Sequence, residues 1–177
     1  MCGRFALQSI PKQVLDEFII IPPPVLPRYN IAPTQKAPVV LVGHDGQPVM
    51  DELRWGLIPS WAKDVSAGVR AINARAETIA EKPTFRDAFR KRRCLVPASG
   101  FYEWRRDGKT KTPYYFTSRK DPIVFAGLWE QWTDGAETIH SFTIITTEAN
   151  GLMAPIHDRM PVILQRGDWW TWLDPDR

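Results

Sequence analysis

The chain has 177 residues, of which 44% are hydrophobic and 24% are charged. These proportions are those of an ordinary globular protein and exclude a disordered or collagen-like chain. The length suits a single domain over residues 1–177. No apolar run approaches the roughly 20 residues of a membrane helix, and the N-terminus, MCGRFALQSIPK, lacks the apolar centre of a secretion signal. We therefore expect a cytoplasmic protein that is not secreted and does not contact a membrane.

Positive charge is concentrated in one segment, although the net charge of the whole chain is only +3. Residues 86–119 contain ten Lys or Arg and three Asp or Glu, a local excess of +7. Arginine outnumbers lysine 15 to 8, and its forked guanidinium is suited to recognising phosphate and carboxylate groups. A basic segment with interspersed aromatic residues is typical of nucleic-acid binding, while a solvated surface is the simpler interpretation.

The first third of the chain predicts one short helix and one loop. Ser9 and Pro11 mark the start of a helix whose apolar face is formed by Val14, Leu15, Phe18 and Ile19. Residues 22–33 (PPPVLPRYNIAP) contain five prolines, and we expect them to form an extended loop.

Strands dominate the rest of the chain. Three Asp-Gly pairs each separate two strand-like segments, which is a strong hairpin signal; they are Asp45-Gly46, Asp107-Gly108 and Asp134-Gly135. Further strands are expected at CLVPA (94–98) and PVILQ (161–165). A helix capped by Thr84 is expected to run to about Lys91, and 168–173 predicts a last helical turn. The pattern predicts an α+β fold, with a mainly antiparallel, strongly curved sheet or open barrel and a few short helices.

Metal and disulfide chemistry are not indicated. The two cysteines, Cys2 and Cys94, are too few for a disulfide framework. The three histidines do not lie with Cys or carboxylates at the spacing of metal ligands. We therefore expect no metal and no cofactor.

Cys2 is the strongest candidate for chemistry. It follows the initiator methionine directly, and its small side chain permits removal of that methionine. The new N-terminus would carry an amine and a thiol on neighbouring carbons, with reference pKa values of about 8 and about 8.5. Such a residue can act as a nucleophile with its own base. It can also condense with an aldehyde, because the amine forms an imine and the thiol closes a thiazolidine ring.

Three further residues suggest acid–base or orienting roles. His157 is held between Pro155 and Pro161 in a rigid loop, which suits proton transfer, although a ring bonded only to its neighbours is an equal alternative. Glu103 lies among aromatic residues in GFYEW, and these would desolvate it unless it faces outward to pair with a nearby arginine. Asn73 precedes a helical turn, where it either caps the turn or orients an amine.

Nine segments occur in the same order as in a known family. They are MCGRF, PRYNIAP, WGLIPSW, INARAET, FRDAFRKRRCLVPASGFYEW, TPYYF, FAGLWE, FTIITTEAN and IHDRMPVIL. Over essentially its whole length the chain resembles the SOS response-associated peptidase (SRAP) family of abasic-site-processing proteins.

The resemblance implies a specific activity. Members use an exposed N-terminal cysteine to bind abasic sites in single-stranded DNA, and they form a covalent thiazolidine cross-link that shields the lesion. The family name refers to a proteolytic activity, chiefly self-removal of the leading methionine, and lyase activity is a further expectation. We would then expect a cytoplasmic, nucleoid-associated monomer.

The same resemblance implies roles for particular residues. Cys2 would be the cross-linking residue, surrounded by Asn73, Glu103 and His157. Phosphates next to the lesion would be held by Arg4, Arg75 and Arg159. Other positions near the DNA-binding face would be Pro33, Trp61 and Thr146, with Trp61 as a stacking platform for unpaired bases. The family domain normally continues past the Trp-rich end of this chain, so we expect either a shortened member or a truncated piece of a longer one.

Two other functions remain open. An N-terminal-nucleophile amidohydrolase also begins Met-Cys-Gly, but here the fourth residue is Arg and no matching substrate-carboxylate loop follows. A non-catalytic module that binds single-stranded DNA would leave Cys2 without a role.

Overall fold

The computed structural model describes residues 2–22, 24–174 and 176. The strands are β1 (Arg4–Leu7), β2 (Arg28–Ile31), β3 (Lys36–Val42), β4 (Pro48–Trp55), β5 (Asn73–Arg75), β6 (Arg93–Ala98), β7 (Gly100–Asp107), β8 (Thr110–Phe116), β9 (Ile123–Thr133), β10 (Thr138–Glu148) and β11 (Arg159–Pro161). The helices are α1 (Lys12–Phe18), α2 (Arg86–Lys91) and α3 (Trp169–Leu173), with 3-10 turns η1 (Val65–Arg70), η2 (Ala76–Thr78) and η3 (Arg166–Asp168). None of the helices in these ranges is long and apolar enough to cross a membrane.

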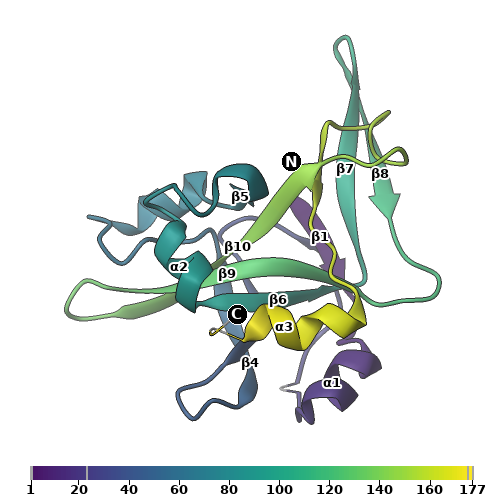
Figure 1. Ribbon diagram of the computed structural model, residues 1–177. Coiled ribbons are helices and arrows are strands. Elements are labelled where there is room, and N and C mark those ends of the chain that lie inside the picture. Colours follow the sequence, from purple (N-terminus) through teal and green to yellow (C-terminus); the bar gives the residue numbers. More distant parts are fainter. Residues whose placement is uncertain (1, 23, 175, 177) are drawn as a thin grey trace.

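The main sheet closes into a barrel of five strands (Figure 1). The strands follow the order β10, β4, β3, β6 and β9, and β9 pairs with β10 to complete the ring. All of these pairings are antiparallel except that of β10 with β4. The predicted α+β fold is therefore confirmed, and the predicted curved sheet closes into a complete barrel.

Alternating residues of β3 belong to two separate buried clusters. Val39 and Leu41 of β3 belong to the cluster that contains Trp55 and Phe142, whereas Val40 between them packs with α1 and α3. Trp55 stacks on Phe142 with ring centroids 6.3 Å apart. Since both faces of β3 are buried, its sequence reads as a continuous apolar run rather than as clean alternation.

The three predicted hairpin turns are all present. They join β3 to β4, β7 to β8 and β9 to β10. The glycine of each Asp-Gly pair has a positive φ, of 77° at Gly46, 58° at Gly108 and 93° at Gly135. Side chains other than glycine rarely adopt this conformation, which is why the pairs signal turns so strongly.

A second sheet has the strand order β2-β1-β7-β8 and is antiparallel throughout. Figure 1 shows its β7–β8 hairpin projecting away from the barrel. The sheet is joined to the barrel through Phe5 of β1, whose ring meets Trp55 at 5.2 Å and Phe125 at 6.1 Å, both edge to face. This packing fixes the start of β1, and therefore Cys2, against the barrel.

Several local predictions are wrong. Residues 28–31 form strand β2 rather than loop, because the N–H groups between Pro27 and Pro33 are free to pair with β1. Ile19 is 91% exposed and not on the apolar face of α1, because the chain leaves the helix there with a φ of 54°.

Two element boundaries also differ from the predictions. Thr84 does not cap α2, because the N-cap position of this helix is occupied by Phe85. The N–H groups of Phe85 and Arg86 donate to the Lys82 carbonyl of the preceding turn. The strand predicted at 161–165 begins earlier, as β11, and continues only as a single bridge between Ile163 and Phe125.

Candidate functional site

A polar cleft of about 360 Å³ opens beside β1 and β7. It is lined by Gly3, Arg4, Glu103, Trp104, Arg106, Lys111 and His157. Three residues proposed from sequence, Arg4, Glu103 and His157, therefore lie together, immediately next to Cys2. Arg4, Arg106 and Lys111 line the cleft together with a single acidic residue, Glu103, so the cleft favours an anionic ligand.

The cleft exists because β7 is longer than its neighbour β1. The pairing of β1 with β7 ends at Arg4 and Tyr102, so from Glu103 onward one edge of β7 has no β1 partner. Glu103 points inward with Phe101, as alternation predicts, and each is 2% exposed. A carboxylate is thereby held at the buried end of the cleft, the position that a proton-transferring group needs.

The Cys2 side chain is fully buried and packs in the same apolar cluster as Phe5 and Phe101. Burial raises the pKa of its thiol, and the negative charge of Glu103 raises it further, while the Arg4 backbone N–H opposes both. The resemblance implied an exposed cysteine, whereas the thiol is covered in this chain, which begins with Met1. The effect of Glu103 on the thiol shows that the two groups are close enough to interact.

The Nδ1 atom of His157 lies next to one hydrogen-bond donor and one hydrogen-bond acceptor. The Arg159 backbone N–H donates to its Nδ1 atom over 2.9 Å, and the Asp158 carboxylate lies 2.9 Å from the same nitrogen. Neutral imidazole accepts the first bond and carries its proton on Nε2, whereas a protonated ring donates to Asp158. A nitrogen placed between a donor and an acceptor in this way suits the proton-transfer role predicted for His157.

Asn73 lies in strand β5 and does not cap a helix. Its Nδ2 donates to the Ile144 carbonyl over 3.4 Å. Its Oδ1 is buried, and no group among the described residues donates to it. A buried acceptor without a donor is uncommon in proteins. Asn73 therefore offers an oxygen to an incoming N–H donor.

Arg75, Thr146 and Arg159 form a second group, on β5, β10 and β11. Thr146 is paired in register with both Arg75 and Pro161. The backbone of Arg159 joins this group to the cleft through His157. The Arg75 side chain is exposed, whereas Arg159 is 8% exposed.

The guanidinium of Arg159 is already bonded. It donates to both carboxylate oxygens of Glu77, at 2.8 and 2.9 Å, and to the Thr146 carbonyl at 2.8 Å. These bonds lower the pKa of Glu77 to about 2. Any phosphate bound by Arg159 would compete with Glu77.

Pro33 and Trp61 are not among the described residues that line the cleft. Trp61 is 63% exposed, on a loop held by the Trp132 Nε1 hydrogen bond to the Ala62 carbonyl. Pro33 lies in the β2–β3 turn before Thr34, whose φ is 72°. The exposure of Trp61 suits the predicted stacking role.

Sequence reasoning missed three residues at these sites. Arg106 and Lys111 line the cleft, and the basic segment 86–119 already indicated cations there without singling them out. Glu77 was missed because its partner Arg159 is 82 residues away in the chain. Only the folded pairing of β10 with β5 and β11 brings the two together.

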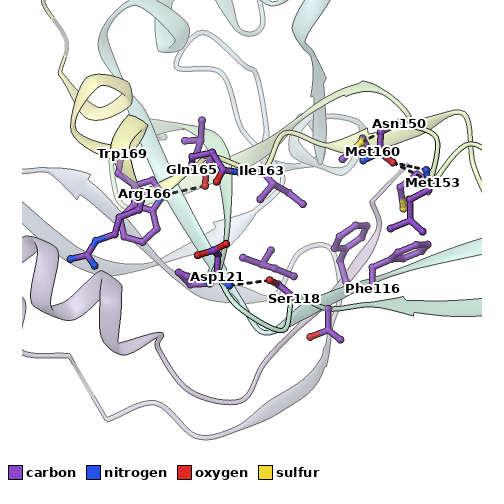
Figure 2. Close-up of a pocket in the computed structure, with 16 residues that line it drawn as sticks. Phe116, Ser118, Asp121, Asn150, Met153, Met160, Ile163, Gln165, Arg166 and Trp169 are labelled. Atoms are coloured by element: carbon purple, nitrogen blue, oxygen red, sulfur yellow. Dashed lines mark hydrogen bonds between the residues drawn. The ribbon is translucent and has the colours of Figure 1, made fainter.

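A second, smaller cavity of about 220 Å³ lies between β8, the 150–153 turns and α3 (Figure 2). Its walls include Phe116, Met153, Met160, Ile163 and Trp169. Figure 2 shows its rim held by hydrogen bonds from Asp121 N to Ser118 Oγ and from Met153 N to Asn150 Oδ1. None of the residues proposed from sequence is among the described residues that line it.

Comparisons with known proteins agree with this architecture. A crystal structure of a protein from Bacteroides thetaiotaomicron superimposes with a TM-score of 0.88 at 29% identity, covering 99% of this chain and 82% of that one. The chain is 46% identical over 182 residues to the abasic site processing protein YoaM of Bacillus subtilis, covering 99% of this chain and 80% of YoaM. It is 35% identical over 181 residues to the abasic site processing protein HMCES of Xenopus tropicalis, covering 84% of this chain and 54% of HMCES. The SOS response associated peptidase family model matches residues 1–177, and the chain therefore belongs to the SRAP family.

Proposed function

We propose that this protein processes abasic sites in single-stranded DNA by forming a covalent thiazolidine cross-link through Cys2. One observation carries the proposal: the buried carboxylate of Glu103 and the ring of His157 share a cationic cleft directly beside Cys2. An abasic sugar supplies the aldehyde, and its flanking phosphates supply the negative charge that the cleft favours. Relatives that are named abasic site processing proteins support the same assignment.

The first step is removal of Met1. Hydrolysis of the Met1–Cys2 peptide bond consumes one water and leaves a free amine on Cys2. We propose that the protein catalyses this cleavage itself, with Glu103 positioned to accept or donate the proton. The new ammonium charge lies beside the thiol and favours its ionisation, opposing the effect of burial.

Cross-linking then follows in three steps: ring opening, imine formation and ring closure by the thiol. His157 donates a proton to the ring oxygen of the closed sugar while the anomeric hydroxyl gives up its proton to Glu103, and the C–O bond of the ring breaks to leave the aldehyde. The Cys2 amine attacks the aldehyde carbon, and water leaves as the imine forms. The thiol then adds across the C=N bond, its sulfur joining the carbon and its proton passing to the nitrogen. Asn73 Oδ1 accepts an N–H of the attacking amine, and Glu103 carries the protons between these groups.

DNA is held by charge and by stacking. Arg4 and Arg75 are proposed to bind the phosphates beside the lesion, and Arg159 joins them when a phosphate displaces Glu77. Trp61 stacks on an unpaired base, a contact that contributes about 1–3 kcal/mol. Since bases in a duplex have no free faces, this arrangement favours single strands.

Denaturing electrophoresis tests the proposal directly. Incubation with an abasic single-stranded oligonucleotide should give a slowly migrating covalent band. The Cys2→Ala variant should give no such band, whereas Cys94→Ala should retain it, because Cys94 is buried within β6 and takes no part in the cleft. No covalent band with the wild-type protein would refute the proposed function.

A further inference from the structure

One face of the β2-β1-β7-β8 sheet carries aromatic and basic side chains in register. Arg4, Tyr102 and Tyr115 form one cross-strand row. The next rows along the β7–β8 hairpin pair Trp104 with Pro113 and Arg106 with Lys111. Alternation directs these side chains away from Phe101 and Glu103. We refer to this set as the outer face: Arg4, Tyr102, Trp104, Arg106, Lys111, Pro113 and Tyr115.

The aromatic rings of the outer face are held in place by their neighbours, and that of Tyr115 is exposed whereas those of Tyr102 and Trp104 are half-buried. The rings of Tyr102 and Tyr115 are 4.7 Å apart, and those of Tyr102 and Trp104 are 6.4 Å apart. The Tyr102 hydroxyl donates to the Tyr29 carbonyl over 3.0 Å. Tyr115 lies over Gly100, where an added Cβ would come within 2.4 Å of its hydroxyl, and it remains 41% exposed. Adjacent aromatic rings are thus presented to solvent at low cost in conformational entropy.

The charge of the outer face has a single sign. Arg4, Arg106 and Lys111 contribute three positive charges, and none of the seven residues is acidic. The two carboxylates of β7, Glu103 and Asp107, stand at alternate positions and point to the other side of the strand. One exposed ring, that of Tyr115, and two half-buried rings, those of Tyr102 and Trp104, lie among cations on a face without a carboxylate, a combination that matches the bases and phosphates of a single-stranded nucleic acid.

The outer face is continuous with the candidate site. Arg4, Trp104, Arg106 and Lys111 belong both to this face and to the lining of the cleft beside Cys2. A DNA strand whose abasic sugar enters the cleft would leave it across Trp104 and reach the tyrosines on the same surface. The cleft and the three rings therefore adjoin on the same sheet.

We propose that the outer face is the binding track for the single-stranded DNA on one side of the lesion. Unpaired bases stack on Trp104, Tyr102 and Tyr115, while Arg106 and Lys111 neutralise the phosphates. The inference rests on the proposed function, which places the abasic sugar in the cleft and so sets where the DNA strand meets the outer face. It extends that function by naming where the strand lies beyond the abasic sugar.

Affinity for lesion-free oligothymidine of about 16 nucleotides tests the track, since this length covers the range of known single-strand sites. Tyr115→Ala should bind at least about 5-fold more weakly, the loss expected for one stacking contact. Tyr115→Phe keeps the ring and should bind like the wild type. The matched control is Tyr114→Ala, because Tyr114 is adjacent on β8 but pairs with Glu103 on the opposite face.

Salt dependence tests the cationic part of the track. Arg106→Ala should reduce the slope of log affinity against log salt by about 0.7, the value for one phosphate contact with a single strand. Arg105→Ala is its control, because Arg105 points to the other side of the hairpin and lies 5.5 Å from the Tyr114 ring. Arg105 and Arg106 are both exposed, so their variants should fold and still test the track if Tyr115→Ala fails to fold.

The outcomes separate the track from the proposed function. Equal losses in the Tyr114 and Tyr115 variants, or equal slopes in the Arg105 and Arg106 variants, would overturn the track even if the wild-type protein cross-links abasic DNA. The expected losses without any wild-type cross-link would refute the proposed function and leave the track supported as a single-strand-binding surface.

Discussion

Arg159 and Glu77 form a two-point ion pair that ties β11 to the turn after β5. The guanidinium NH1 and NH2 groups each donate to a different oxygen of the carboxylate, and NH2 also donates to the Thr146 carbonyl. Parallel N–H···O bonds of this kind fix orientation as well as distance. The pair therefore sets the positions of Arg75, one residue before the turn, and of His157, whose ring accepts the Arg159 backbone N–H.

The pair predicts a loss of stability in acid. It lowers the pKa of Glu77 from 4.5 to about 2. A carboxyl group with a lowered pKa in the folded state contributes stability above its unfolded pKa, and loses it as pH falls through the folded value. The free energy of unfolding of the wild type should therefore fall toward that of Glu77→Gln between about pH 4.5 and about pH 2.

Urea titrations of both proteins across this pH range measure the effect. Glu81→Gln controls for the removal of one exposed negative charge four residues further along the chain. A difference between wild type and Glu77→Gln that stays constant over the whole range would contradict the assigned cause.

The two arginines near Thr146 should respond differently to substitution. Arg75 is exposed, so Arg75→Glu should weaken binding to single strands of every sequence alike, because phosphates carry no base identity. Arg159→Ala should in addition lower Tm by about 2–4 °C or more, since it leaves the Thr146 carbonyl and Glu77 without their donor. Fluorescence anisotropy with several oligonucleotide sequences and thermal melting measure the two effects. A loss confined to one base sequence would show that Arg75 reads bases.

Glu103 should affect the rate of cross-linking far more than DNA affinity. Glu103→Gln keeps the size and hydrogen bonding of the side chain but cannot ionise. Removing a general acid or base typically slows a reaction about 100-fold to 10,000-fold, whereas a residue that is 2% exposed behind three cations adds little to equilibrium binding. Time courses of adduct formation, together with affinity for intact single strands, separate the two. If affinity falls as steeply as rate, Glu103 has a structural role.

Local signals in the sequence were sufficient for the turns and for the face of Glu103. A turn at an Asp-Gly pair depends only on the backbone conformation of those two residues. The face on which each GFYEW side chain lies depends only on the alternation of side chains along a strand. Asn73 could not be placed in this way, because β5 has three residues and exists only through its pairing with β10. The same applies to Arg159, whose ion-pair partner is supplied by tertiary structure. Burial of Cys2 likewise depends on the packing of β1 against the barrel.

Variants of the N-terminus test the thiazolidine mechanism, which needs a free amine and a thiol on the same residue. Cys2→Ala retains an amine that can form an imine but not a ring. It should give no stable adduct spontaneously, yet borohydride should trap it on abasic DNA. An uncleavable residue placed before Cys2 keeps the thiol and blocks the amine. This extended protein should fail both tests while binding single-stranded DNA almost normally.

The same proteins distinguish the alternative functions. A simple thiol nucleophile would tolerate the extension, because its attack does not pass through an imine. An N-terminal-nucleophile amidohydrolase would hydrolyse glutamine, lose that activity in both variants and never cross-link. A passive binding module would show no difference among the wild type and the two variants. Denaturing electrophoresis with and without borohydride, combined with a glutaminase assay, reads all of these outcomes. A stable adduct formed by the extended protein would rule out the thiazolidine mechanism, because its blocked amine cannot take part in the ring.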